Sequence, residues 1–271
     1  MRRAFIASLV ALSIAVAPAM SDEPGYAVTA DVPFGDLPGQ VLDIYTPATV
    51  NDDTPVLVFL FGGGFRYGDK SRPRLIGQSF ADAGTIVVAP NYRTKTAFPA
   101  FIEDAAKAVA YVWKELRTNQ GDPRPIIISG WSAGAYIGGI VSYDGRYLKA
   151  EGVPSDAVSG FIGLAGPYWG GLCSGARCPS IFPPDTDADW PVAGFVDAGD
   201  PPMLLIQGPL DNYVDIGNLE TLAAAGKAAD LDVTTLIAEK RSHKSVMHDM
   251  EEHGTEVRAA VEAFLGKVAS D

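Results

Sequence analysis

The feature that most constrains this chain is a strand, a glycine-flanked turn and a helix in direct succession over residues 125–141. Pro125 to Ile128 is a short apolar, β-branched run, which predicts a buried strand. Residues 135–141 are mostly apolar and predict a helix packed against a sheet. The glycines of the intervening Gly130-Trp131-Ser132-Ala133-Gly134 let the two backbones approach closely. This succession is typical of an α/β sheet, whose helices cover the strands that they follow.

The rest of the 271-residue chain repeats the alternation of strand and helix. Strands are expected at 30–35, 41–46, 55–61, 85–90, 158–165, 202–208 and 233–238, and helices at 75–83, 101–116, 212–229 and 246–268, the last one bent near Gly254. Such an order predicts a mostly parallel central sheet with helices on both faces. We therefore expect a single α/β domain over residues 20–271.

A segment rich in glycine and proline, Gly166 to Phe195, interrupts this alternation. Long connections inside a compact domain are commonly functional. We expect this one to form a loop insertion over the active site, at the carboxyl edge where open α/β sheets bind ligands. Its aromatic residues, Tyr168, Trp169 and Trp190, are candidates for shaping a substrate pocket, with burial in the core as the alternative.

The two cysteines, Cys173 and Cys178, lie in the same segment, separated by four residues. In an oxidising compartment such a pair predicts a local disulfide. A metal site there is not expected, because two cysteines without a neighbouring histidine supply too few ligands.

The first residues have the pattern of a signal peptide. Arg2 and Arg3 form a charged start, residues 5–16 are almost entirely apolar, and Ala17-Pro18-Ala19 supplies an A-x-A cleavage site. We expect residues 1–19 to be removed near Ala19 from a periplasmic or secreted protein, by the general or the twin-arginine route. No stretch is long enough to predict stable membrane insertion. The net charge of −12 argues against nucleic acid as a partner, and the oligomeric state is left open.

Ser132 has the setting of a nucleophile elbow, and a serine nucleophile needs a base and an acid that follow it in the chain. All three histidines do follow it. His243 is favoured as the base because it comes directly after the last predicted strand. His248 is second, and His248 and His253 are otherwise expected to be solvated helix residues. Neither forms a metal motif.

Asp211 follows the strand at 202–208 and is the expected acid, with Asp215 as the alternative. Asp211 could instead cap the helix expected from residue 212. An oxyanion hole is expected from the backbone N–H groups of Ala133, Gly63 and Gly64, because a triple glycine directly after a buried strand brings amides close to a substrate. The alternative for Gly62-Gly63-Gly64 is an ordinary loop. No cofactor and no metal are expected.

Several segments resemble the carboxylesterase branch of the α/β-hydrolases, which includes hormone-sensitive-lipase-like esterases and acetyl-xylan and feruloyl esterase-like proteins. Residues 61–70 resemble its HGGGW-x-x-GDK segment, residues 42–47 its L-D-V-Y-x-P strand, and residues 130–134 its G-x-SAG elbow. Tyr92-Arg93 with Phe98-Pro99-Ala100 resembles its YR…FPA segment. Residues 201–214 resemble its PP-x-L-L-I-H-G-x-x-D-x-x-V segment. The resemblance implies an α/β-hydrolase fold and cleavage of short-chain or carbohydrate-linked carboxylic esters.

Four positions depart from that pattern: Phe61, Trp131 and Gln207 replace histidines, and Phe65 replaces a tryptophan. None removes an expected triad residue, but the loss of the histidine at Phe61 could loosen the glycine loop and reduce the rate. Two alternatives to the esterase therefore stay open. One is a formamidase-type amidohydrolase with the same triad, and the other is an impaired family member that binds a ligand or a partner.

Overall fold

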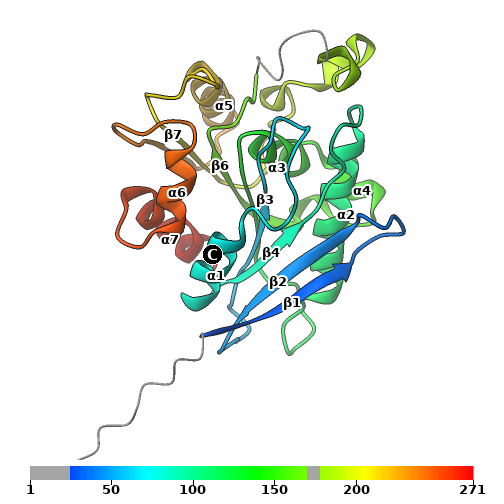
Figure 1. The fold of residues 1–271 in the computed structure, drawn as a ribbon, viewed down its shortest axis with the longest axis vertical. Helices are drawn as coiled ribbons and strands as arrows, with labels where there is room; N and C mark the ends of the chain where they lie inside the picture. Colours follow the sequence, from blue (N-terminus) through cyan, green and yellow to red (C-terminus); the bar gives the residue numbers. More distant parts are fainter. Residues whose placement is uncertain (1–24, 170–177, 271) are drawn as a thin grey trace, which may run out of the picture.

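The computed structural model describes residues 25–169 and 178–270, apart from the side chains of residues 155, 188 and 189. Its centre is one eight-stranded sheet in the order β1-β2-β4-β3-β5-β6-β7-β8 (Figure 1). β1 pairs antiparallel with β2 and β2 with β4, whereas all later pairs are parallel. The strands are β1 Tyr26–Pro33, β2 Val41–Pro47, β3 Val56–Leu60, β4 Ile86–Pro90, β5 Ile126–Trp131, β6 Val158–Leu164, β7 Met203–Gln207 and β8 Val233–Ile237.

Helices cover both faces of this sheet, as the alternation of patterns predicts. α2 (Ala100–Glu115), α3 (Ala133–Tyr143), α4 (Gly145–Ala150) and α5 (Gly217–Ala228) pack on one face. α1 (Arg74–Asp82), α6 (Ser245–Glu251) and α7 (Glu256–Val268) pack on the other (Figure 1). The central strands β3, β4, β5 and β7 are buried throughout, because both of their faces meet helices.

The structure corrects several expected boundaries. The first strand begins at Tyr26 rather than at residue 30, and the helix expected from residue 212 begins at Gly217. The single C-terminal helix is two helices, α6 and α7. His253 lies in the turn between them, not on a helix, next to Gly254 in the left-handed region at φ 81°.

The described part of the segment at 166–195 contains three short 3₁₀ helices, Cys178–Ser180, Pro184–Asp189 and Val192–Gly194. It is attached to the body by hydrogen bonds from Phe98 N–H to the Ile181 carbonyl and from Trp169 N–H to Asn218 Oδ1 of α5 at 2.8 Å. A further bond, from Val192 N–H to the Tyr168 carbonyl, joins the two ends of the segment. Residues 170–177, including Cys173, lie outside the described residues, as do residues 1–24 with the expected signal peptide. The disulfide from Cys173 to Cys178 and the cleavage near Ala19 therefore stay predictions.

Among residues 25–169 and 178–270, no helix combines the length and apolar character needed to cross a membrane.

Candidate active site

Ser132 occupies the sharp turn between β5 and α3. Its backbone has φ 56° and ψ −120°, in a region that residues with a side chain adopt at a cost of order 1–3 kcal/mol. The Ser132 N–H donates to the Leu164 carbonyl at 2.9 Å, so that β6 holds the turn in place. Such a strained turn at the carboxyl end of a central strand presents the side chain outward instead of burying it in the helix.

The two glycines of the motif are required by close packing. A Cβ on Gly130 would lie 2.4 Å from the Gly134 carbonyl carbon, where the chain doubles back on itself. A Cβ on Gly134 would lie 2.0 Å from the Leu60 carbonyl oxygen of β3. Real Cβ contacts are longer than this, so any larger residue forces the helix away from the sheet. The sequence rule for this motif thus has a direct steric cause.

Three side chains from three strand ends form one hydrogen-bonded chain. His243 Nε2 lies 2.9 Å from Ser132 Oγ, and His243 Nδ1 lies 2.8 Å from Asp211 Oδ2. Ser132 follows β5, Asp211 follows β7, and His243 lies in the loop between β8 and α6. The side chains of His243 and Asp211 are 8% and 1% exposed, so water competes little for these bonds. The structure thus brings together the three residues that the sequence singles out.

Asp211 is oriented by its own loop. Its Oδ1 accepts hydrogen bonds from the N–H groups of Tyr213 at 2.8 Å and Val214 at 3.0 Å, which leaves Oδ2 for His243. Burial alone would raise the pKa of the Asp211 carboxyl. The hydrogen bonds from His243, Val214 and Tyr213 outweigh burial and hold that pKa below its usual value. Asp211 therefore does not cap a helix; it forms a tight turn six residues before α5.

The glycine loop follows β3 and is closed by a turn. The Gly63 carbonyl accepts from the N–H groups of Arg66 at 3.2 Å and Tyr67 at 3.1 Å. Gly64 has φ 58°, a left-handed conformation that glycine adopts without penalty. Within the described parts of the chain, the N–H groups of Gly63, Gly64 and Ala133 have no hydrogen-bond acceptor. They are therefore free to bind an oxyanion.

Comparison with known proteins supports the fold described above. The BD-FAE family model matches residues 42–154. The carbohydrate esterase from gut microbiota, in a truncated form, superposes with a TM-score of 0.76 at 19% identity, covering 92% of this chain and 99% of that one. Thermogutta terrifontis esterase 2 superposes with a TM-score of 0.73 at 21% identity, covering 90% and 95%. This chain has the α/β-hydrolase fold.

The curated relatives include esterases and a kynurenine formamidase of Danio rerio, which is 26% identical over 41% of this chain and 37% of its own length. The isoprenylcysteine alpha-carbonyl methylesterase ICME of Arabidopsis thaliana is 25% identical over 80% of this chain, and the match spans 56% of that protein. Carboxylesterase NlhH of Mycobacterium tuberculosis is 31% identical over 44% of this chain and 35% of its own length. The chain thus spans only about half, or less, of these relatives. The predicted fold class and the resemblance to α/β-hydrolase esterases are confirmed.

In this α/β-hydrolase, Phe61 makes contacts that hold the glycine loop. The Phe61 ring stacks on Tyr92 with centroids 4.1 Å apart, and the Tyr92 hydroxyl donates to the Phe61 carbonyl at 2.7 Å. Arg72 Nη1 donates to the next carbonyl in the loop, that of Gly62, at 3.3 Å. The contacts of Phe61, Tyr92 and Arg72 therefore offset the expected loosening of the loop. The sequence did not indicate that Tyr92 and Arg72 contact it.

Trp131 and Gln207 likewise hold the loops that carry His243 and Asp211. The Trp131 indole Nε1–H donates to the His243 backbone carbonyl at 2.7 Å, and the two rings lie 5.0 Å apart. Gln207 Nε2 donates to the Val214 carbonyl at 2.6 Å in the turn that orients Asp211. The only sequence signal for either role was the departure from the family pattern.

The remaining candidate residues lie away from the hydrogen-bonded chain. Asp215 turns back on its own loop and accepts from the Gly217 N–H at 2.8 Å. His248 lies on α6 and pairs with Glu251, and His253 contacts Ser79. Asp215, His248 and His253 therefore take no part in the hydrogen-bonded chain that Ser132, His243 and Asp211 form.

Of the three aromatic residues proposed to shape a pocket, two belong to the core. Tyr168 is fully buried against Phe161, and Trp190 packs on Phe182. Only Trp169 is exposed, and it lines a surface depression together with Tyr213, whose ring lies 5.2 Å from that of His243. In the described part of the chain, no group of three or more histidine, cysteine and acidic residues could hold a metal ion.

Proposed function

We propose that this chain is an exported serine hydrolase that cleaves carboxylic esters through an acyl-enzyme intermediate. Its catalytic residues are Ser132, His243 and Asp211. The observation that carries the proposal is the hydrogen-bonded chain from Ser132 Oγ through His243 to a buried carboxylate, at a strained turn. The named esterases among the relatives and structural neighbours support the same chemistry.

The geometry defines the direction of proton transfer. Asp211 is acceptor-only when ionised, so it fixes the His243 tautomer with its proton on Nδ1, and Nε2 is left to accept the Ser132 proton. Ser132 Oγ then attacks the acyl carbon while its proton moves to Nε2. The imidazolium returns that proton to the leaving alcohol, and water repeats the sequence to release the acid. The ionised Asp211 stabilises the imidazolium at each step.

The developing oxyanion needs donors that point at it before the reaction starts. The N–H groups of Gly63, Gly64 and Ala133 fit this role, because within residues 25–169 and 178–270 nothing else accepts from them. Loss of one such donor typically lowers kcat by 10²–10³. The contacts of Phe61, Tyr92 and Arg72 with the loop keep these donors in position.

For the substrate, we propose short-chain or carbohydrate-linked acyl esters. The exposed rings of Trp169 and Tyr213 line a depression next to the His243 imidazole. Exposed aromatic rings offer a flat apolar surface against which the alcohol part of an ester can pack. The structural similarity to a carbohydrate esterase from gut microbiota supports this choice. Export rests on the pattern of residues 1–19.

The test is hydrolysis of p-nitrophenyl esters from acetate to octanoate and of acetylated sugars, with Ser132→Ala as the control. We expect turnover of the shorter esters and a loss of about 10⁶-fold in kcat for Ser132→Ala and for His243→Ala. His248→Ala is the matched histidine control and is expected to retain activity. Equal, slow hydrolysis by the wild type and Ser132→Ala would refute the esterase. An N-formyl arylamine in the same panel tests the amidohydrolase.

A further inference from the structure

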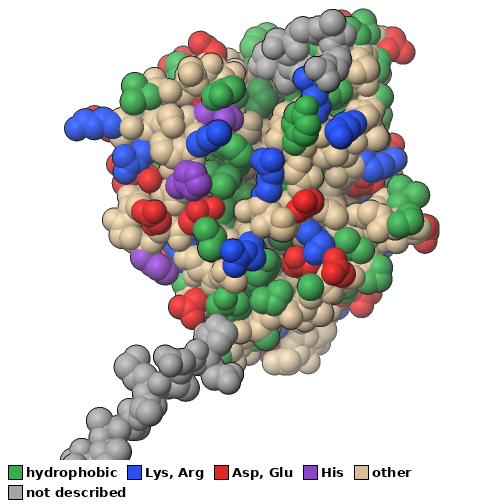
Figure 2. Space-filling view, in the orientation of Figure 1, with side chains coloured by type: hydrophobic (Ala, Val, Ile, Leu, Met, Phe, Trp, Pro, Cys, Tyr) green, Lys and Arg blue, Asp and Glu red, His purple; other side chains and the backbone are tan. Residues whose placement is uncertain are grey.

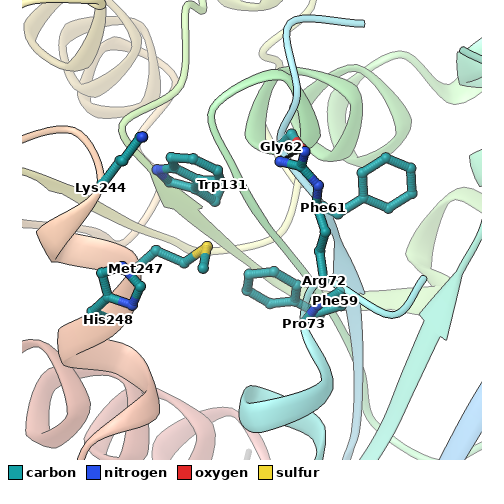
Figure 3. A pocket seen from close by; sticks show the side chains of 9 residues that line it. All are labelled: Phe59, Phe61, Gly62, Arg72, Pro73, Trp131, Lys244, Met247 and His248. Carbon is teal, nitrogen blue, oxygen red and sulfur yellow. Dashed lines mark hydrogen bonds between the residues drawn. The ribbon is translucent and has the colours of Figure 1, made fainter. Parts of the chain in front are cut away.

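A second cavity, of about 220 Å³, lies on the face of the sheet covered by α1 and α6. Its walls are apolar side chains: Phe59 and Phe61 from β3 and its end, Trp131 from β5, and Met247 from α6. In Figure 3 the Met247 side chain points into the space between Trp131 and Phe59. None of Ser132, Asp211 and His243 lines this cavity. It is therefore separate from the depression that Trp169 and Tyr213 line.

Three cationic or titratable side chains stand at the edges of these apolar walls: Arg72, Lys244 and His248. Figure 2 shows apolar surface in a hollow near α6, with Lys or Arg and His side chains beside it. In the described parts of the chain, Arg72 and Lys244 form no ion pair with any carboxylate. Arg72 bonds only to the Gly62 carbonyl.

The acidic residues near this cavity offset its positive charge only in part. Hydrogen bonds from Ser71 and the charge of Arg72 lower the pKa of the Asp69 carboxyl, but within the described residues Asp69 and Arg72 form no ion pair. His248 pairs with Glu251 at 3.3 Å, whereas Asp69 accepts from the Ser71 N–H at 2.8 Å. Two cations that form no ion pair with a described residue therefore flank one apolar cavity in a chain with a net charge of −12. Positive charge above apolar walls is complementary to a molecule with an anionic end and an apolar body.

We propose that this cavity is a binding site for a small carboxylate with an apolar body of about the size of benzoate. An apolar cavity of about 150 Å³ accommodates benzene, so about 220 Å³ leaves room for a ring and a carboxylate. The ring packs against Trp131, Met247 and Phe59. The carboxylate lies at the edge of the cavity, where Lys244 and Arg72 supply positive charge. The proposal does not depend on the hydrolase activity.

The experiment is titration calorimetry of full-length Ser132→Ala protein with sodium benzoate, so that turnover plays no part. We expect saturable binding of one benzoate per chain. Benzamide has the same shape without the charge and is expected to bind at least tenfold more weakly. Lys244→Gln removes one cation and is expected to weaken benzoate binding about tenfold or more, since hydrogen bonds to charged groups are the stronger ones. Met247→Trp fills the cavity and is expected to abolish benzoate binding.

Lys227→Gln is the matched control, because Lys227 is an exposed lysine on α5 with no ion pair in the described residues. It is expected to bind benzoate as the parent protein does. Melting curves of each variant verify that it is folded; Lys244 is exposed and Met247 borders empty space, so both changes are compatible with the fold. The proposal is overturned if benzoate does not bind or binds no better than benzamide. It is also overturned if folded Lys244→Gln and Met247→Trp both retain the parent affinity.

Discussion

Replacing Trp131 with phenylalanine tests whether this side chain positions the catalytic base. The change keeps an aromatic ring beside Gly62 and the imidazole but removes the indole N–H. That N–H donates to the His243 carbonyl at 2.7 Å, and no other donor reaches this carbonyl in the described parts of the chain. Trp131 is 8% exposed, so water replaces the lost bond poorly.

The expected magnitude follows from that geometry. A buried acceptor left without its donor costs about 1–3 kcal/mol. If this free energy is lost in holding the imidazole between Ser132 and Asp211, kcat falls roughly 5- to 150-fold. KM changes little, because Trp131 is not in the depression next to His243 that we propose for the substrate. The ring of phenylalanine is smaller than indole, so the melting temperature falls by a few degrees as well.

The assay is steady-state hydrolysis of p-nitrophenyl acetate, with kcat and KM determined separately, together with thermal melting. Trp113→Phe is the control, since Trp113 lies on α2, away from the triad, and packs under the guanidinium of Arg117. It loses packing of similar size without touching His243. Wild-type kcat in folded Trp131→Phe would refute the reasoning, and so would an equal loss of kcat in Trp113→Phe.

Three further predictions concern the same framework. Gly134→Ala places a Cβ 2.0 Å from the Leu60 carbonyl oxygen, and we expect it to prevent correct folding, as measured by the yield of soluble protein. A Cβ at Gly64 meets no atom within 4 Å, so Gly64→Ala is expected to lower the free energy of unfolding by only about 1–2 kcal/mol, because of its φ of 58°, as measured by urea denaturation. Asp211→Asn is expected to lower kcat by about 10⁴. The folded-state pKa of Asp211 is depressed, so the stability that its charge contributes is present above the usual carboxyl pKa and is lost as the pH falls through the folded pKa. The difference in melting temperature between wild type and Asp211→Asn should therefore shrink on acidification from pH 7 to pH 3. A constant difference would contradict this. Arg258→Met removes a buried guanidinium that donates to Ser79 Oγ at 2.8 Å and lies 3.5 Å from the Phe80 ring centre. Its ion-pair partner Glu262 is 47% exposed, so no buried charge is left, and we expect a cost of about 1–3 kcal/mol in denaturant unfolding with the fold retained.

The sequence was most informative where one residue type has one steric or chemical reason to be present. The close approach of β5 and α3 explains why residues 130 and 134 are glycines. The order of residues after Ser132 was enough to select Asp211 and His243 as candidates. The alternation of apolar runs predicted the sheet because each central strand meets helices on both faces.

What the sequence did not predict depends on contacts between distant segments. Nothing in the local pattern says that Trp131 reaches a carbonyl 112 positions later, or that Tyr92 stacks on Phe61. Tyr168 and Trp190 were expected near a pocket because their segment is irregular, yet their rings complete the core beside α3 and Phe182. Propensity cannot separate these outcomes, since a large apolar ring is suited to both.

The proposed base, His243, follows the edge strand of the sheet, and this position bears on how the molecule would lose function. β8 is the last strand in the order, pairs only with β7, and is the least buried of the parallel strands. Partial opening of a protein begins where few buried contacts hold a strand. If β8 separates from β7, His243 leaves the triad while the inner strands β3, β5 and β6 and the turn at Ser132 stay intact. Inactivation on heating would then be a local and reversible event that precedes global unfolding.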